Sequence, residues 1–236
     1  MTGQRHLAVG APVPGGSVFL RALGREASRL HPEVYRYVSG SGVVGQAVDL
    51  EGVFDVAGSR LRRLNLLARP IVGPGLLVTA FERDVPFRVA NRPGFERLRG
   101  RAGGAGAGRG ELGLHAERTF EFRSGGQSFV DVLLVGDAPG RLRNLLGERR
   151  RVELELRCTV TDRGRLRLEP SRTWLRFGRL RVRLPRLLSV RAVVEDGFDD
   201  ATGRNTVDAR VGSPILGTVL EYRGSFRQAP RPCLLY

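Results

Sequence analysis

The sequence predicts a mainly β fold, an up-and-down antiparallel barrel or strongly curved half-barrel with short N-terminal helices packed on it. Residues 152–160 and 179–184 alternate between apolar and charged residues with a period of two. Successive side chains of a strand point to opposite faces, so each run has one apolar and one charged face. About ten strand-like segments follow one another between turn sequences, and closing a sheet into a barrel removes its exposed edges most completely.

The part of the chain before the first strand is predicted to be helical. Within residues 17–38 apolar residues recur with helical spacing, and Pro32 suits the first turn of a second short helix. Residues 1–16 contain Gly and Pro without periodicity, and we expect a flexible leader there. Residues 17–236 are then expected to form a single β-barrel-like domain.

Strands are expected from residue 44 onwards. The first covers 44–56, with Gly52 as a candidate bulge or bend. The low-complexity segment 99–111 predicts a flexible Gly-rich loop, and a short helical turn is expected from Pro139 to Leu146. The remaining strands are predicted at 76–82, 85–91, 112–123, 127–135, 152–161, 165–169, 172–177, 179–184, 187–195, 205–212 and 216–227.

The charge of the chain has two interpretations. All 39 basic residues are arginine, against 24 acidic residues, for a net charge of +15. Such an excess forms either a solvated coat whose stems cover apolar surface, or a surface for nucleic acid or anionic membrane. Nucleic acid is disfavoured, because few aromatic residues lie between the arginines for stacking on bases.

The sequence predicts no cofactor and no metal. Cys158 and Cys233 make neither a disulfide framework nor a metal motif, which indicates a reducing compartment and a cytoplasmic protein. No signal peptide or transmembrane segment is recognisable. His115 and Glu117 could supply two ligands on one strand face, but no third ligand is suitably spaced. No Ser, His and Asp arrangement indicates nucleophilic catalysis, so the catalytic residues, if there are any, stay unknown.

Candidate site residues are polar residues that fall in an apolar row, or a large aromatic residue near the barrel mouth. Burying an unpaired polar group costs about 1–3 kcal/mol, so these residues need a partner or a function. Trp174 is expected to pack in the core or at the mouth. The candidate ligand-binding residues are Arg118, Asp131, Tyr222, Gln46, Asn91 and Trp174.

Arg118 and Asp131 belong to one predicted hairpin, and its turn decides how they meet. A two-residue turn at Ser124-Gly125 places them directly opposite each other. A turn at Gly125-Gly126 keeps both on the inner face as a diagonal pair, whereas a three-residue loop points Asp131 outward. An inward pair is either a structural ion pair or the polar end of a ligand pocket.

Several short motifs occur in an order that is itself informative. They are Leu30-His-Pro-Glu-Val-Tyr-Arg36, Glu51-Gly-Val-Phe54, Arg83-Asp-Val-Pro-Phe-Arg-Val89, Glu117-Arg-Thr-Phe120, Arg179-Leu-Arg-Val-Arg-Leu-Pro185, Gly212-Ser-Pro-Ile-Leu-Gly217 and Glu221-Tyr-Arg-Gly-Ser-Phe226. Over about residues 30–227 this order resembles the DUF4166 family, a bacterial domain of unknown function, with the Gly-rich loop as an insertion. The resemblance implies no established activity. Some relatives are fused to NAD-binding oxidoreductase-like domains, and the lack of such a domain here favours a stand-alone binding or accessory role.

Three functions are compatible with these observations, and the oligomeric state stays open. The first is the binding of a hydrophobic small molecule or lipid-like ligand inside the barrel. The alternative is a cofactor-independent cyclase or isomerase acting on a polyketide- or terpenoid-like substrate in the same pocket, for which the discriminating sign is a polar residue with a perturbed pKa facing an internal cavity. The third is an arginine-rich surface for nucleic acid or anionic membrane.

Overall fold

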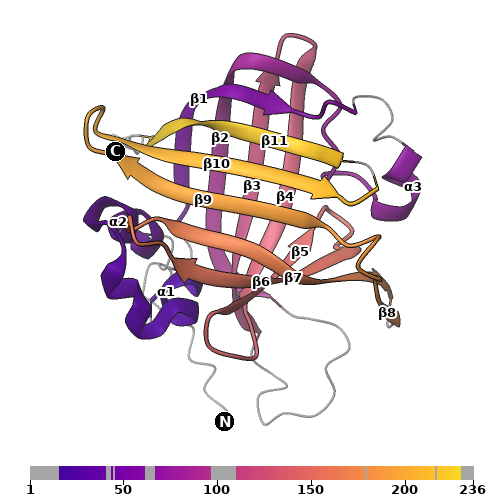
Figure 1. Ribbon diagram of the computed structural model, residues 1–236, viewed down its shortest axis with the longest axis horizontal. Coiled ribbons are helices and arrows are strands. Elements are labelled where there is room, and N and C mark those ends of the chain that lie inside the picture. Colours follow the sequence, from indigo (N-terminus) through magenta and orange to yellow (C-terminus); the bar gives the residue numbers. More distant parts are fainter. Residues whose placement is uncertain are drawn as a thin grey trace, which may run out of the picture.

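The computed structural model describes residues 16–40, 44, 46–61, 67–96, 110–178, 180–215 and 217–229. Over these residues, ten antiparallel strands close into a barrel in the order β1 to β7, β9, β10 and β11, which confirms the predicted fold (Figure 1). The strands are β1 (Val48–Gly58), β2 (Phe81–Glu96), β3 (Glu111–Phe122), β4 (Gly125–Val135), β5 (Arg141–Leu146), β6 (Val152–Val160), β7 (Leu166–Phe177), β8 (Leu180–Arg183), β9 (Arg191–Asp199), β10 (Arg204–Ser213) and β11 (Gly217–Gln228).

The barrel wall changes partners along β7. This strand pairs with β6 over most of its length, from Leu166 opposite Val160 to Leu175 opposite Val152. On its other edge it pairs with β9 only through 166–168. Its final part, 174–177, pairs instead with the extra strand β8. Among the described residues, 169–173 therefore have no strand partner on the β9 side, and the wall is interrupted there.

The N-terminal helices cover one end of the barrel. Helix α1 (Val18–Leu23), the 3₁₀ turn η1 (Gly24–Arg29) and helix α2 (Pro32–Gly40) lie at the lower left of Figure 1, and α3 (Arg69–Val72) lies at the upper right. The Ser17 side chain accepts a hydrogen bond from the Leu20 amide and so caps α1. Helix α1 contacts β3 to β6. None of the helices that the structure describes is long and apolar enough to cross a membrane.

Two large apolar clusters fill most of the interior. One cluster joins the helices to β3 to β7, and the other joins β1 to β3 with β10 and β11. In the second cluster the rings of Phe54 and Phe87 stack with their centroids 3.7 Å apart. Tyr37 and Phe129 pack against both clusters, so they lie at the boundary between them.

The charged face of the alternating strands lies outside, where many arginines pair with carboxylates on neighbouring strands. Glu153 of β6 contacts Arg176 and Arg181, and Arg167 of β7 contacts Glu195 of β9 at 2.8 Å. Partly exposed ion pairs such as Arg167–Glu195 contribute little each, typically about 0–1 kcal/mol, whereas the Glu153 side chain is only 5% exposed. They account for part of the arginine excess as a solvated coat.

Local expectations differ from the structure at several places. The helical turn expected at 139–146 is wrong: Arg141–Leu146 is strand β5, because pairing with β4 and β6 outweighs the local turn signal. Gly52 keeps a regular register, and the irregularity in β1 lies between Phe54 and Val56. The strand expected at 76–82 begins only at Phe81. The predicted leader and Gly-rich loop fall almost entirely in 1–15 and 97–109, outside the described residues.

Candidate functional site

A cavity of about 290 Å³ lies inside the barrel. Each of the ten barrel strands contributes to its lining, mostly with apolar side chains. Phe19 and Tyr37 line it from the helices, and Val72, Leu76 and Leu77 line it from α3 and the segment that follows. Its volume is at the lower end of ligand pockets, which are typically about 300–1,000 Å³.

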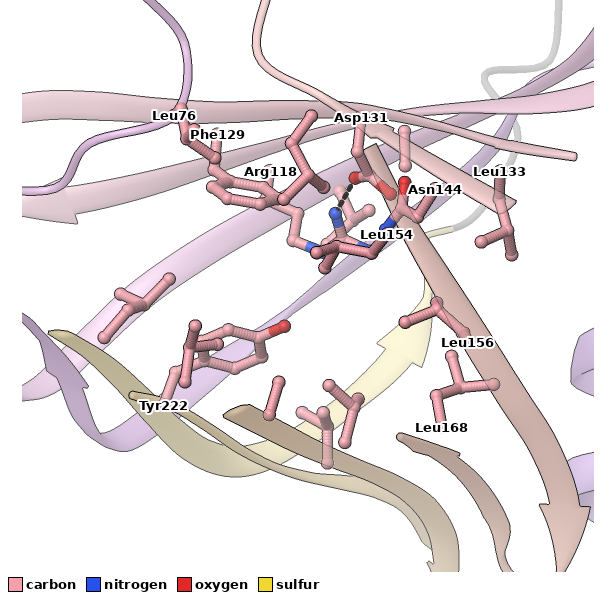
Figure 2. A pocket seen from close by; sticks show the side chains of 18 of the residues that line it. Leu76, Arg118, Phe129, Asp131, Leu133, Asn144, Leu154, Leu156, Leu168 and Tyr222 are labelled. Carbon is pink, nitrogen blue, oxygen red and sulfur yellow. Dashed lines mark hydrogen bonds and ion pairs between the residues drawn. The ribbon is translucent and has the colours of Figure 1, made fainter. Parts of the chain in front are cut away.

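Arg118 and Asp131 form an ion pair in this cavity (Figure 2). The hairpin turns at Arg123-Ser124, so Arg118 pairs across the ladder with Phe129 and Asp131 with Ala116. The parity expected for a two-residue turn is therefore confirmed, but the turn lies one residue before the nearer of the two predicted positions. The two side chains meet as a diagonal pair on the inner face, a geometry that long side chains can span.

The residues around Arg118 stabilise its positive charge. Burial alone would lower its pKa, but the Asp131 carboxylate, with help from Tyr222 and Tyr37, raises the pKa above its ordinary value. The guanidinium also lies 5.6 Å from the centre of the Phe129 ring, within cation–π range. Asp131 is 5% exposed, so within the pair each charge neutralises the other away from bulk water.

Asp196 of β9 is the carboxylate in this cavity without a partner. The described residues place no hydrogen-bond donor or ion-pair partner on it, although it feels the more distant charge of Arg118. Protein surrounds it, and the surface it retains faces the cavity. Burial raises its pKa from 3.8 to about 6, with Arg118 opposing this shift. Such a carboxyl exchanges protons near neutral pH, as a general acid or base requires.

Neutral polar groups complete the polar part of the lining. Burial raises the pKa of both Tyr37 and Tyr222 above that of an ordinary tyrosine, so both hydroxyls keep their protons. Asn91 is buried and interacts with the Tyr37 hydroxyl. Asn144 lies beside the ion pair in Figure 2, and within the described structure its Oδ1 atom is buried without a hydrogen-bond partner.

The structure brings four of the six candidate residues together and leaves two apart. Arg118, Asp131, Tyr222 and Asn91 line the cavity. Gln46 is half-buried ahead of β1 and does not line it.

Trp174 requires a correction, because it lies on the outer face of the barrel. It pairs with outward Glu153 of β6 and lies beneath the Arg181 guanidinium, 4.0 Å from the ring centre. It is buried by β8 rather than by the core, since β8 pairs with the end of β7.

Three polar residues that line the cavity were not predicted from the sequence, although the pattern around two of them could have indicated it. Asn144 alternates with Leu142 and Leu146, but this segment was expected to be helical. Asp196 continues an inward row of β9, but the strand was expected to end at 195, whereas it runs to Asp199. Tyr37 gave no such signal, since it lies on a helix whose placement depends on tertiary packing.

The outer histidine of β3 lies beside a carboxylate of the neighbouring strand. His115 Nε2 lies 3.5 Å from Glu96 of the neighbouring strand, and burial lowers its pKa. In the parts of the chain that the structure describes, no group of three or more His, Cys, Asp or Glu side chains could hold a metal ion.

Comparison with known proteins agrees with the resemblance seen in the motifs. The family described as a domain of unknown function, DUF4166, matches residues 30–226. The chain belongs to the DUF4166 family. It is also 26% identical over 150 residues to the uncharacterised protein YndH of Bacillus subtilis (strain 168), a match that covers 63% of this chain and 67% of YndH. No solved structure matches this DUF4166 member.

Proposed function

We propose that the barrel binds a hydrophobic small molecule or lipid-like ligand in its internal cavity. The observation that carries this proposal is the combination of an apolar wall with polar groups that lack partners, Asp196 and Asn144 Oδ1. Leaving such groups buried without partners costs free energy, and a bound ligand would supply the missing hydrogen bonds. The buried thiol of Cys158, whose pKa burial raises to about 12, is compatible with residence in the cytoplasm.

The free polar groups also indicate the chemistry of the ligand. Asp131 already neutralises Arg118, so the described residues that line the cavity offer no unpaired positive charge to a ligand carboxylate. The unpaired atoms are hydrogen-bond acceptors, the Asp196 carboxylate and Asn144 Oδ1. The polar end of the ligand should therefore carry donors such as hydroxyl or amine groups. We expect a monoacylglycerol to bind more tightly than the fatty acid of the same chain length.

Native mass spectrometry of freshly purified protein tests the proposal. The expected result is an adduct that organic solvent releases, and competition between a monoacylglycerol and its fatty acid in favour of the former. A protein that carries no adduct and takes up neither compound would refute ligand binding. Preference for the fatty acid would refute the assignment of the polar end.

A substitution that fills the cavity should abolish binding. Ala192 lines the cavity, whereas the side chain of its neighbour Val193 is 36% exposed and points outward. Ala192→Phe is expected to lose the adduct at a stability cost of about 1–3 kcal/mol, and Val193→Phe to retain it. Equal adduct occupancy in both variants, measured by native mass spectrometry, would place the ligand elsewhere.

One observation favours a second function, a cofactor-independent isomerase or cyclase in the same cavity. Asp196 has a raised pKa of about 6 and faces the cavity, which is the sign that distinguishes proton-transfer chemistry from binding alone. Tyr37 and Tyr222, both protonated, could stabilise a developing negative charge on the substrate.

Deuterium exchange separates the two functions. An enzyme that moves a proton on carbon should incorporate deuterium from D₂O into the co-purifying compound, and Asp196→Asn should stop this incorporation without abolishing binding. Incorporation at the same rate with wild-type protein, with Asp196→Asn and without protein would leave only the binding function.

A further inference from the structure

The barrel end away from α1 and α2 exposes a group of large apolar side chains. These belong to α3, to the end of β7, to β8, to the 184–190 segment and to the β10–β11 turn, which lie at the right of Figure 1. Leu187, Leu180 and Ile215 are 68%, 61% and 63% exposed. The group, here called the apolar rim, consists of Leu67, Ile71, Phe177, Leu180, Val182, Leu187, Leu188 and Ile215.

Contacts between distant segments hold parts of the apolar rim close together. Arg151 donates hydrogen bonds to the carbonyl oxygens of Pro70 and Ile71, at 2.9 and 3.0 Å. The same guanidinium lies 5.5 Å from the centre of the Phe177 ring, so it joins α3 to the end of β7. Gly212 of β10 pairs with Arg191 at the start of β9, which brings the β10–β11 turn next to the 184–190 segment.

The segment that carries most of the apolar rim contains arginines but no acidic residue of its own, and the nearby Glu153 pairs with two of these arginines, Arg176 and Arg181. The 19 residues from Trp174 to Ala192 contain six arginines and no acidic residue. Arg183 and Arg186 are exposed, and among the described residues neither has an ion-pair partner. This differs from the side of the barrel, where arginines such as Arg167 pair with glutamates. Arginines without ion-pair partners would attract an anionic surface, and the exposed leucines among them would contact an apolar layer beneath that surface.

A cleft of about 620 Å³ lies beside the apolar rim, where β7 parts from β9. Its outer lining includes Arg157, Arg172, Arg191 and Arg210. Pro170, Val190, Ala192 and Val211 line both this cleft and the internal cavity. The cleft and the cavity are therefore separated by a single layer of small and medium-sized side chains.

We propose that the apolar rim docks on the surface of an anionic phospholipid bilayer, and that the cavity exchanges its ligand with that bilayer through the cleft between β7 and β9. The exposed leucines insert among the acyl chains near the headgroups while the arginines contact lipid phosphates. The second part of this proposal rests on the proposed function, because only a lipid-like ligand would pass between a membrane and the cavity.

Lipid fits the apolar rim better than nucleic acid does. Single-stranded nucleic acid is bound by aromatic side chains on which bases stack. The apolar rim contains one aromatic residue, Phe177, and its other members are aliphatic. Aliphatic side chains contribute to membrane binding in proportion to the apolar area they bury, but they offer bases no stacking surface.

Sedimentation with vesicles tests the docking. Wild-type protein is expected to bind vesicles of phosphatidylcholine mixed with phosphatidylglycerol, and to bind vesicles of phosphatidylcholine alone only weakly. Each arginine near an anionic surface changes affinity by about 5-fold, so Arg183→Gln with Arg186→Gln should weaken binding about 25-fold. Leu187→Ser with Leu188→Ser should also weaken it. These side chains are exposed, so the variants should fold normally.

A matched control removes the same charge at the helical end. Arg163 and Arg204 are exposed; Arg163 lies in the β6–β7 turn, and Arg204 is the first residue of β10, directly after the β9–β10 turn. Both turns adjoin α2, since His31 donates its amide to Gly164 at 2.9 Å and stacks on Phe198. Arg163→Gln with Arg204→Gln should leave vesicle binding unchanged. The docking would be overturned if the two arginine double variants lost vesicle binding equally, or if the wild-type protein bound both vesicle types equally. Displacement of the protein from vesicles by a single-stranded oligonucleotide would also overturn it.

A second readout separates docking from ligand binding. Native mass spectrometry after incubation with the vesicles should detect a lipid adduct, and the Arg183→Gln, Arg186→Gln variant should acquire it more slowly. If the protein binds vesicles but acquires no adduct, the proposed function and the exchange step are refuted, whereas the docking is supported. An adduct acquired equally fast by the variant would overturn the exchange through this end, while ligand binding in the cavity stands.

Discussion

Arg118→Leu is expected to lower the free energy of unfolding by about 3–5 kcal/mol. The substitution leaves Asp131, which is 5% exposed, as an unpaired carboxylate inside the barrel. For a chain of this size, about 2–4 °C of melting temperature is lost per kcal/mol, so a decrease of about 10 °C should be seen in thermal unfolding followed by circular dichroism. Melting at the wild-type temperature would show that the ion pair does not support the fold.

The double variant Arg118→Leu, Asp131→Leu distinguishes a structural role from a ligand-binding role. Removing both charges removes the unpaired group, so the double variant should regain most of the lost stability. A ligand whose polar end depends on this part of the cavity should still fail to bind. Recovery of both stability and binding would identify the pair as structural only.

The sequence was sufficient to predict which side chains of this hairpin face the barrel interior, but it was not sufficient to predict which residues pair across the two strands. Period two placed Arg118 and Asp131 on one face, because parity depends only on whether the turn has an even or odd number of residues. Whether they meet directly or diagonally depends on which two residues form the turn. Arg123-Ser124 form it, with Gly125 at φ 116° opening β4, and the sequence of the turn does not distinguish this from its neighbours.

The residues that were missed or misplaced depend on how the strands pair in the folded protein, which the local sequence does not determine. Trp174 follows an irregularity in the β6–β7 register, between Glu155 and Leu156, that shifts the alternation of β7 by one residue. A single extra residue moves every later side chain to the opposite face, so Trp174 points outward. Sequence periodicity cannot locate such a bulge when both faces of the segment carry arginine and leucine.

The arginine content separates into two parts that the composition could not distinguish. Arginines on the side of the barrel meet carboxylates on neighbouring strands, as Arg227 meets Glu51 at 2.9 Å. Of the described arginines between Trp174 and Ala192, Arg176 and Arg181 share Glu153, and the others have no ion-pair partner among the described residues. Only the placement of strands decides which arginines acquire partners, and this placement makes the end beside β8 the positively charged one.

Asp196→Asn is expected to stabilise the protein at neutral pH and to leave its stability unchanged in acid. The folded state raises the pKa of Asp196 from 3.8 to about 6, so the folded protein binds this proton more tightly than the unfolded chain does. The contribution of Asp196 to stability is therefore complete below about pH 4 and is lost as pH rises from about 4 to about 6. A rise of about two pKa units corresponds to about 3 kcal/mol, which is the largest gain expected above pH 6.

Urea unfolding at a series of pH values measures this gain, with Asp55→Asn as the control. Asp55 is 70% exposed on the outer face of the barrel, so its replacement should change stability little at any pH. A stability difference for Asp196→Asn that does not vary with pH would contradict the raised pKa. Under the proposed function, a bound ligand would supply Asp196 with the hydrogen-bond donor that it lacks. A ligand that donates a hydrogen bond to Asp196 should accordingly stabilise the wild-type protein more than the variant.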